Sequence, residues 1–113
     1  MTRAIRASLL HSAVVTGILA SMPAAMAQDE GARIAQGRRT AEVACVQCHR
    51  IDAKGKPGKA DAPAFEAIAN IRSMTELSVK VFLQSPHASM PMLHLSAAEL
   101  DGLAAYIMSL RHR

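Results

Sequence analysis

The sequence predicts an all-α domain, and three features of its pattern support this fold class. Small and apolar residues recur at helical spacing between Gly37 and Cys48. Further along the chain, Ser73 and Ser96 each stand three residues before a glutamate, which is the spacing of a helix-opening capping box. No segment alternates apolar and polar residues in the way that a half-buried β-strand does.

The first 27 residues have the pattern of a secretory signal peptide. Arg3 and Arg6 give a positive start, residues 9–20 are mostly apolar, and residues 25–27 form the small-x-small triplet that signal peptidase cleaves. The apolar run is shorter than the roughly 18 residues that a membrane-spanning helix needs. We therefore expect cleavage after Ala27, export to the periplasm and no stable membrane insertion. An uncleaved anchor is the alternative.

Residues 28–113 then form one small domain. All nine acidic residues remain in it but two of the thirteen basic ones are lost with the leader, so its formal net charge is +2. No basic run with interleaved aromatic residues is present, and nucleic-acid binding therefore has no support. Phe65, Phe82 and Tyr106 are the only aromatic residues. A domain this small needs a further core component, such as a metal or a cofactor.

The first helix is expected to start near Asp29, whose side chain could cap it, and to run into the two cysteines. Residues 52–63 predict a loop, because Gly55, Pro57 and Gly58 follow one another closely there. Residues 64–70 predict a short helix.

A third helix should start at Ser73, with Glu76 completing its capping box, and should end before Pro86. The apolar residues that we expect to face the core are Leu77, Val81 and Phe82.

The last helix has the clearest boundaries in the sequence. Ser96 and Glu99 form its capping box, and Leu95 and Leu100 stand at the positions of a hydrophobic staple. The basic residues at 111–113 lie at the helix C-terminus, where the helix dipole favours positive charge. The core-facing positions at helical spacing are Leu100, Leu103, Ala104, Ile107 and Leu110.

The pentapeptide CVQCH at positions 45–49 predicts covalent attachment of one haem c. Two sulfurs spaced i, i+3 at a helix end project to the same side, which matches two vinyl groups on one porphyrin edge. His49 directly follows Cys48, which places its imidazole under the ring and within reach of the iron. The other ring N–H of a metal-bound histidine needs an acceptor, and a backbone carbonyl just before Phe65 is our candidate.

Three other uses of the two cysteines fit less well. A disulfide between Cys45 and Cys48 would close a four-residue loop and restrict the unfolded chain very little. A structural zinc site needs four ligands, usually in two pairs, and no second cysteine pair exists. A thioredoxin-like redox pair would follow a β-strand, and no βαβ pattern is present.

The second axial ligand of the iron should come from residues 85–96. Met90 is the preferred candidate, because the following Pro91 favours an extended backbone in a loop that can present a side chain. Met92 is its competitor. His87 is expected to be a turn residue facing solvent, and His94 could serve only if the loop folded differently.

These motifs together resemble a class I c-type cytochrome, of the small bacterial periplasmic kind with a single haem. The resemblance covers nearly the whole mature chain. In chain order it rests on Gly37, CVQCH at 45–49, Ala62-Pro63-Ala64-Phe65, Pro86-His87, Met90-Pro91 and the closing helix with Tyr106.

The resemblance implies a cytochrome c fold of three to four helices around the covalently bound haem. It implies that Cys45 and Cys48 carry the haem, that His49 and Met90 ligate the iron, and that the Pro63 carbonyl accepts from His49. It also implies a close crossing of the first and last helices at Gly37, with Tyr106 packed there.

The sequence departs from the family at two places. Ala41 stands where an aromatic residue often packs, which suggests a looser helix crossing. No tryptophan is available near the haem propionates, and the cationic residues left as candidates for them are Lys54, Lys56, Lys59 and Arg72.

By this resemblance the protein is expected to be an electron carrier rather than an enzyme, and to exchange single electrons with redox partner proteins. The alternatives are a haem-based sensor that binds small ligands, if neither methionine holds the iron, and a dedicated haem subunit of a larger oxidoreductase.

Overall fold

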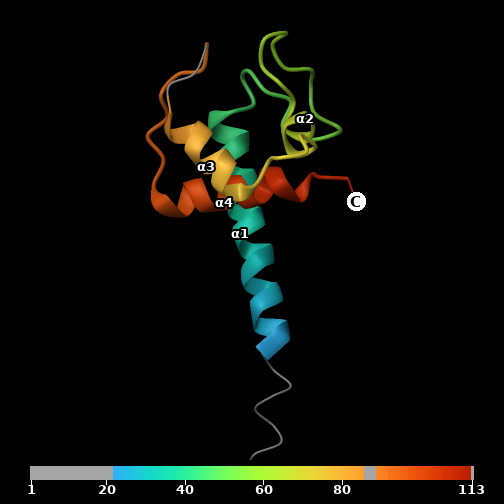
Figure 1. The fold of residues 1–113 in the computed structure, drawn as a ribbon, viewed down its shortest axis with the longest axis vertical. Helices are drawn as coiled ribbons and strands as arrows, with labels where there is room; N and C mark the ends of the chain where they lie inside the picture. Colours follow the sequence, from blue (N-terminus) through green and yellow to red (C-terminus); the bar gives the residue numbers. More distant parts are fainter. Residues whose placement is uncertain (1–21, 86–88, 113) are drawn as a thin grey trace, which may run out of the picture.

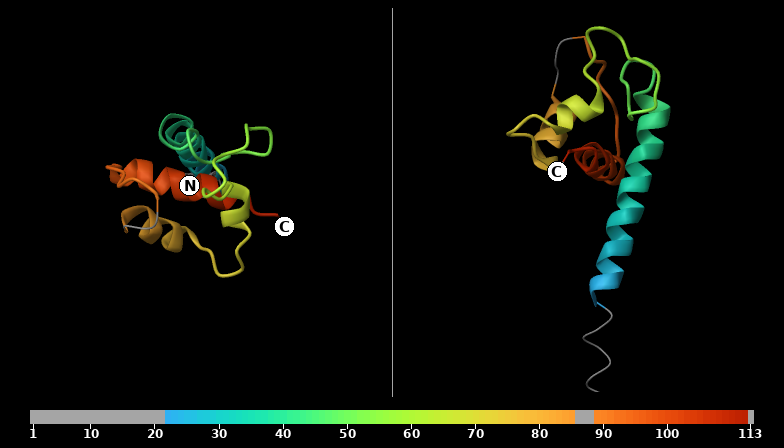
Figure 2. Two further views of the ribbon diagram at one scale, coloured as in Figure 1. Left: turned by 90° about the horizontal axis from the view of Figure 1, so that it is seen from above. Right: turned by 90° about the vertical axis from the view of Figure 1, so that its right-hand side faces the viewer.

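The computed structural model describes residues 22–85 and 89–112, and in this part of the chain all regular structure is α-helical, as predicted. α4 is the central helix and lies between α1 on one side and α2 and α3 on the other (Figures 1 and 2). The N-terminal half of α1 extends away from this compact head. The helices are α1 (Met22–Ala44), α2 (Phe65–Ala69), α3 (Glu76–Gln84) and α4 (Ala97–Ser109).

α1 and α4 cross in backbone contact at two glycines. A Cβ atom added to Gly37 would lie 1.8 Å from the carbonyl oxygen of Gly102, and one added to Gly102 would lie 2.9 Å from the nitrogen of Gly37. The looser crossing expected from Ala41 is therefore wrong. Ala41 is fully buried, and its small side chain lets the two helices approach closely.

α1 begins at Met22 rather than near Asp29, so Asp29 lies inside the helix and does not cap it. The reason is the composition of residues 22–28, which are rich in alanine and methionine, two strong helix formers. Pro23 falls in the first turn, where proline is tolerated.

α3 differs from its prediction in both its cap and its buried face. Its N-cap is Thr75, whose side-chain oxygen accepts a hydrogen bond from the Ser78 backbone N–H at 3.1 Å. Residues 71–74 form a turn before the helix, with the Met74 N–H donating to the Ile71 carbonyl, and the predicted box at Ser73 is therefore wrong.

The buried residue of α3 is Val79, whereas Leu77 is 71% exposed and Val81 and Phe82 are about half exposed. The expectation that Leu77 and Val81 face the core is wrong, whereas Phe82, although half exposed, lines the cavity described below. Apolar residues stand on two faces of this helix, and docking against α4 selects the face of Val79 and Leu83.

Ion pairs fix α3 to its neighbours. The Arg33 guanidinium of α1 donates two hydrogen bonds to the Glu76 carboxylate at 2.9 and 3.1 Å. Its pKa is raised, first by the hydrogen bond to Glu76 and then by the one to Glu30. Lys80 of α3 pairs with Asp101 of α4. These contacts join α3 to both α1 and α4.

α4 begins as predicted. Ser96 and Glu99 form a reciprocal capping box, and the hydrogen bonds from the Ser96 side chain and backbone lower the pKa of Glu99. Leu103, Ala104 and Ile107 are buried in the main core, as expected, while Leu100 and Leu110 are only partly buried.

No helix in the described part of the chain is both long enough and apolar enough to cross a membrane.

Candidate haem site

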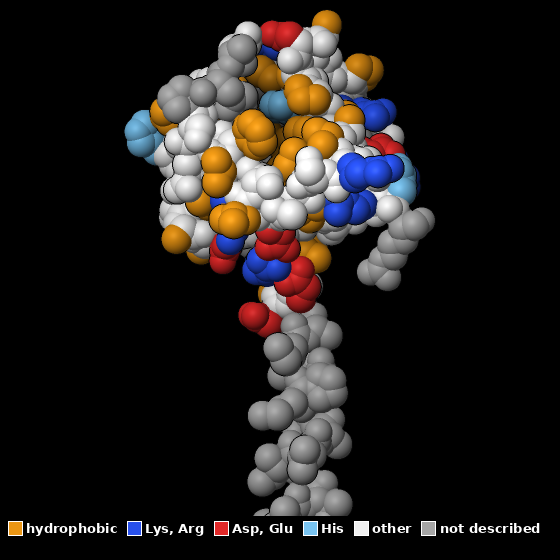
Figure 3. All heavy atoms as spheres, in the orientation of Figure 1, with side chains coloured by type: hydrophobic (Ala, Val, Ile, Leu, Met, Phe, Trp, Pro, Cys, Tyr) orange, Lys and Arg blue, Asp and Glu red, His pale blue; other side chains and the backbone are white. Residues whose placement is uncertain are grey.

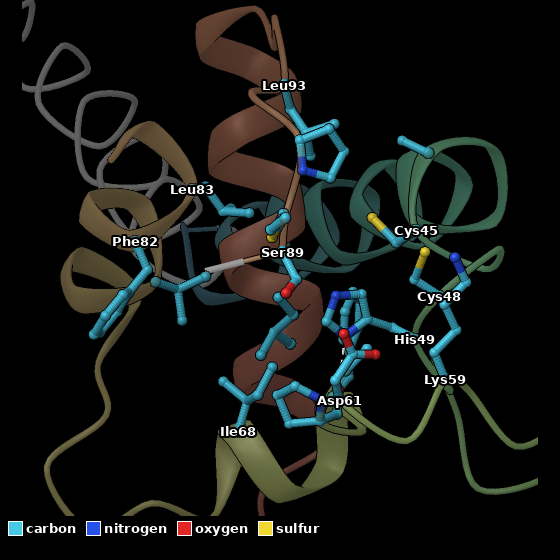
Figure 4. Close-up of a pocket in the computed structure, with 18 of the residues that line it drawn as sticks. Cys45, Cys48, His49, Lys59, Asp61, Ile68, Phe82, Leu83, Ser89 and Leu93 are labelled. Atoms are coloured by element: carbon cyan, nitrogen blue, oxygen red, sulfur yellow. Dashed lines mark hydrogen bonds between the residues drawn. The ribbon is translucent and has the colours of Figure 1, made fainter. Parts of the chain in front are cut away.

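The two cysteines lie in a tight turn at the end of α1. The helix continues for one more hydrogen bond, from the Cys45 N–H to the Ala41 carbonyl at 2.9 Å. The N–H groups of Cys48 and His49 then both donate to the Cys45 carbonyl, at 3.1 and 2.9 Å. This geometry brings both sulfurs to one edge of a cavity and directs the His49 ring into it (Figure 4).

The loop over residues 52–63 packs directly on this turn. The Lys59 N–H donates to the Cys48 carbonyl at 2.7 Å, and the Phe65 N–H donates to the Arg50 carbonyl at 3.0 Å. A Cβ atom on Gly58 would lie 2.3 Å from the Cys48 carbonyl oxygen, so this position requires glycine.

The Pro63 carbonyl orients His49. It lies 2.7 Å from His49 Nδ1, and because a carbonyl can only accept, Nδ1 carries the proton of this hydrogen bond. The lone pair of Nε2 is then free to bind a metal. The structure confirms the predicted backbone acceptor just before Phe65.

The His49 ring is the first of three neighbouring rings that extend into the core. The His49 and Phe65 ring centroids are 5.4 Å apart, and the Phe65 and Tyr106 centroids are 6.4 Å apart in an edge-on arrangement. The Tyr106 hydroxyl donates to the Ile51 carbonyl at 3.0 Å, so its buried polar end is satisfied. The histidine is thus held by a hydrogen bond on one ring atom and by contact with the tilted Phe65 ring.

The cavity has a volume of about 380 Å³ and is largely apolar. Figure 3 shows hydrophobic side chains around a hollow in the head, with a histidine ring visible inside. In Figure 4, Phe82 and Leu83 of α3 lie across the cavity from the cysteines. Its apolar lining includes Ala44, Phe65, Ile68, Ile71, Met74, Val79, Phe82, Leu83, Leu93 and Ile107.

The structure separates the two methionine candidates. Met90 lines this cavity together with Ser89 and Pro91. Met92 is 55% exposed and lines a second pocket, together with His94. His87 lies outside the described residues. Of the four cationic candidates for the propionates, Lys59 lines the cavity and Lys54, Lys56 and Arg72 do not.

Ser89 has a left-handed backbone conformation, with φ of 64°. Residues other than glycine adopt this conformation rarely and at some cost in free energy. Ser89 immediately precedes Met90, so the backbone conformation of this strained residue determines the direction of the chain at Met90, which lines the cavity.

Cys45 and Cys48 do not form a disulfide with each other. Cys45 is 4% exposed, and burial raises the pKa of its thiol to about 11, with the neighbouring Cys48 adding to the shift. A neutral sulfur suits this position, and a thioether is also neutral. The sulfur environment therefore fits covalent attachment of an apolar group.

The donor set also fits a porphyrin. Within residues 22–85 and 89–112, no three His, Cys, Asp or Glu side chains converge in the way that ligands of a metal ion would. A single histidine with an apolar surround suits an iron whose in-plane positions are filled by a macrocycle. The residues present thus fit haem c.

Comparison with known proteins identifies the family. Residues 34–111 match the family model described as Cytochrome c. The chain is also 33% identical to cytochrome c-552 of Bradyrhizobium diazoefficiens over 98 aligned residues. The alignment covers 87% of this chain and 90% of that relative. This chain belongs to the cytochrome c family. No solved structure gives a significant match.

As a c-type cytochrome of class I, this protein is an electron-transfer protein that works with redox partners, and its cofactor is covalently attached haem c.

Sequence reasoning did not identify three residues that shape the site or its supporting helices, namely Gly58, Ser89 and Gly102. Gly102 had a usable signal, because a glycine within an apolar helix face usually has a packing reason. The other two stand in irregular segments, where their types are common.

Proposed function

We propose that the mature cytochrome is a periplasmic carrier of single electrons with one haem. Cys45 and Cys48 form its thioether links, and His49 and Met90 are its axial ligands. The haem supplies a one-electron iron couple, while the chain attaches it, fixes both axial positions and surrounds it with apolar side chains.

The observation that carries this proposal is the shared cavity of the four residues. Cys45, Cys48, His49 and Met90 all line it, whereas Met92 and His94 line a different pocket. A carrier needs both axial positions filled in both oxidation states, so that little rearranges on electron transfer. A thioether sulfur suits this role because it binds both ferrous and ferric iron, and Pro91 restricts the loop that presents it.

Substitution of the two methionines tests the carrier assignment against a ligand-binding sensor. The wild-type ferric protein should show the weak sulfur-to-iron absorption band at the red end of the spectrum, and its ferrous form should bind carbon monoxide poorly. Met90→Ala should abolish the band and open the iron to carbon monoxide. Met92→Ala, the matched control, should change neither property.

The other outcomes each lead to a definite revision. If Met92→Ala has these effects instead, the axial ligand is Met92 and the carrier function stands. If the wild type lacks the band and binds carbon monoxide readily, the carrier proposal is wrong and the sensor function replaces it. Co-purification of wild-type protein in a fixed ratio with an oxidoreductase would make it a subunit of that complex.

Export and cleavage of residues 1–27 are part of the same proposal. Cleavage after Ala27 would cut α1 near its start and leave Asp29 in the new first turn, where a carboxylate is favourable. N-terminal sequencing of periplasmic material should therefore begin at Gln28, in open or cyclised form. Intact Met1 in the membrane fraction would establish the anchor instead.

A further inference from the structure

Arg111, two residues before the end of the sequence, binds three backbone carbonyls far from it in the chain. Its Nε donates to the Ala69 carbonyl at 2.7 Å, and its Nη2 donates to the carbonyls of Met74 at 2.7 Å and Ile71 at 3.1 Å. Ala69 is the last residue of α2, whose final carbonyls have no partner within the helix. Arg111 therefore closes the end of α2 and the turn that follows it.

His112 adds two contacts to the same segment. Its backbone N–H donates to Asn70 Oδ1 at 3.1 Å, and its Nε2 lies 2.6 Å from Glu66 Oε1. We call Arg111 and His112, with these acceptors on residues 66–74, the C-terminal clasp. The clasp ties the end of α4 to a segment about forty positions earlier in the chain.

Residues 66–74 form one wall of the haem cavity. Ile68, Ile71 and Met74 line it, and Met74 is buried. α2 has only five residues, too few to be stable by itself, and its two buried residues are Phe65 and Ala69. The position of this wall therefore depends on contacts between its backbone and the rest of the protein. The Arg111 guanidinium supplies three of them, through hydrogen bonds to three carbonyls of the wall.

We propose that Arg111 is a positioning residue that keeps this wall closed over the haem and thereby holds the reduction potential of the cytochrome high. The proposal rests on the haem seat described above, with Cys45 and Cys48 at its edge. Water admitted beside the iron stabilises the more highly charged ferric form, and solvent exposure is one of the factors that set haem potentials. Loosening the wall should thus lower the potential.

Two variants separate the clasp from simple loss of charge. Arg111→Gln removes both the planar, forked set of guanidinium donors and the positive charge. Arg111→Lys keeps the charge but replaces a planar fork with a single donor position that cannot span the three carbonyls. Because removing a cation would itself favour ferric iron, Arg111→Lys is the decisive variant and also the milder one for folding.

The chain offers two matched controls. Arg39→Gln removes an exposed positive charge whose side chain bonds to Gln36 of its own helix. Ser96→Ala removes the helix cap of α4, which destabilises the protein without touching the cavity wall. The two controls report the effects of charge and of lost stability by themselves.

The experiment measures midpoint potentials of the holoproteins and hydrogen exchange of the Ile71 and Met74 amides. We expect both Arg111 variants to shift the potential downward by more than either control. In both, the two amides should exchange about tenfold faster than in wild type, because their turn has lost its outer hydrogen bonds. Exchange in α4 should change less.

Three results would overturn the proposal. In the first, Arg111→Lys keeps the wild-type potential while Arg111→Gln does not, and charge alone is then responsible. In the second, Ser96→Ala shifts the potential as far as the Arg111 variants do, and general destabilisation is then the cause. In the third, neither Arg111 variant changes potential or exchange. All of these measurements can be made whichever methionine binds the iron, so failure of the clasp and failure of the Met90 assignment are distinguishable.

Discussion

At the scale of single residues, the backbone prepares the haem site as much as the side chains do. The Pro63 carbonyl fixes the tautomer of His49, and Gly58 lets the loop reach the Cys48 carbonyl. Ser89 holds a left-handed conformation immediately before Met90. The orientation of the haem-binding side chains thus depends on neighbouring residues that act through their backbone conformation.

Ser89 provides a direct test of this dependence. A β-branched residue is especially unfavourable in the left-handed region, so Ser89→Val should strain the loop and weaken delivery of Met90 to the iron. We expect imidazole to displace the methionine from the ferric protein about tenfold more readily, which corresponds to about 1.4 kcal/mol. Ser89→Gly, which accepts the same φ, is the control and should stay within about threefold of wild type. Equal imidazole affinities for the valine and glycine variants would contradict this account.

The residues of the site could be predicted where covalent chemistry dictates spacing. Haem attachment requires two thiols and a histidine at a fixed spacing, so the sequence pattern alone predicts Cys45, Cys48 and His49 as the residues that bind it. For the second ligand the sequence favours Met90 over Met92 through Pro91, and the fold adds that Met90 lines the cavity whereas Met92 lines another pocket. Arg111 could not be found from the pattern, since its acceptors are backbone carbonyls that belong to no residue type.

At the scale of secondary-structure elements, the crossing of α1 and α4 organises the head. Gly37 and Gly102 let the two backbones touch, which brings the end of α1, with its cysteines, over the buried face of α4. Ala41 and Leu103 are fully buried at this crossing. The crossing thus determines where the two cysteines, which would hold the haem, lie relative to Ile107, which lines the cavity from α4.

Alanine substitution of two glycines in α1 tests this role. Gly37→Ala should destabilise the holoprotein by about 1–3 kcal/mol, because the new methyl meets a backbone carbonyl that cannot rotate away. Gly31→Ala, in the same helix with nothing within 4 Å of the added atom, should be neutral or stabilise by up to about 1 kcal/mol. Denaturant unfolding measures both changes, and similar stabilities for the two variants would mean that the crossing is not tight in solution.

Element boundaries could be predicted where a local hydrogen bond defines them. The capping box at Ser96 was found because both partners lie within four residues. The box at Ser73 was wrong because the buried Met74 and its turn take up those residues, and Thr75 caps α3 instead. The buried face of α3 was also missed, since the choice between Leu77 and Val79 depends on where α4 lies.

At the scale of the whole molecule, the haem cavity is part of the main core. Phe65, Met74, Val79 and Ile107 belong both to the cavity lining and to the main cluster of buried hydrophobic residues. A space of about 380 Å³ therefore lies within the packing that must hold the four helices together. The expectation that a small domain with three aromatic residues needs a further core component agrees with this arrangement.

The free-energy cost of leaving this cavity empty can be compared with the stability of a typical domain. At roughly 24 cal/mol per Å³, the cost found for enclosed empty cavities, this volume corresponds to about 9 kcal/mol. That figure is an upper bound, because the cavity opens to solvent. It is nevertheless comparable with the roughly 5–15 kcal/mol that stabilises a typical domain.

We therefore expect the protein without haem to lack a cooperative fold. Cys45→Ser combined with Cys48→Ser should give colourless protein with reduced helical content and no cooperative thermal transition, measured by circular dichroism. The matched control is residues 28–113 of the wild-type sequence, produced in the cytoplasm without the haem-attachment machinery. It keeps both cysteines and should behave in the same way, because absence of the cofactor, and not loss of the thiols, removes the core. A colourless protein of either kind that melts cooperatively, with the stability of the holoprotein, would show that the helices pack adequately by themselves.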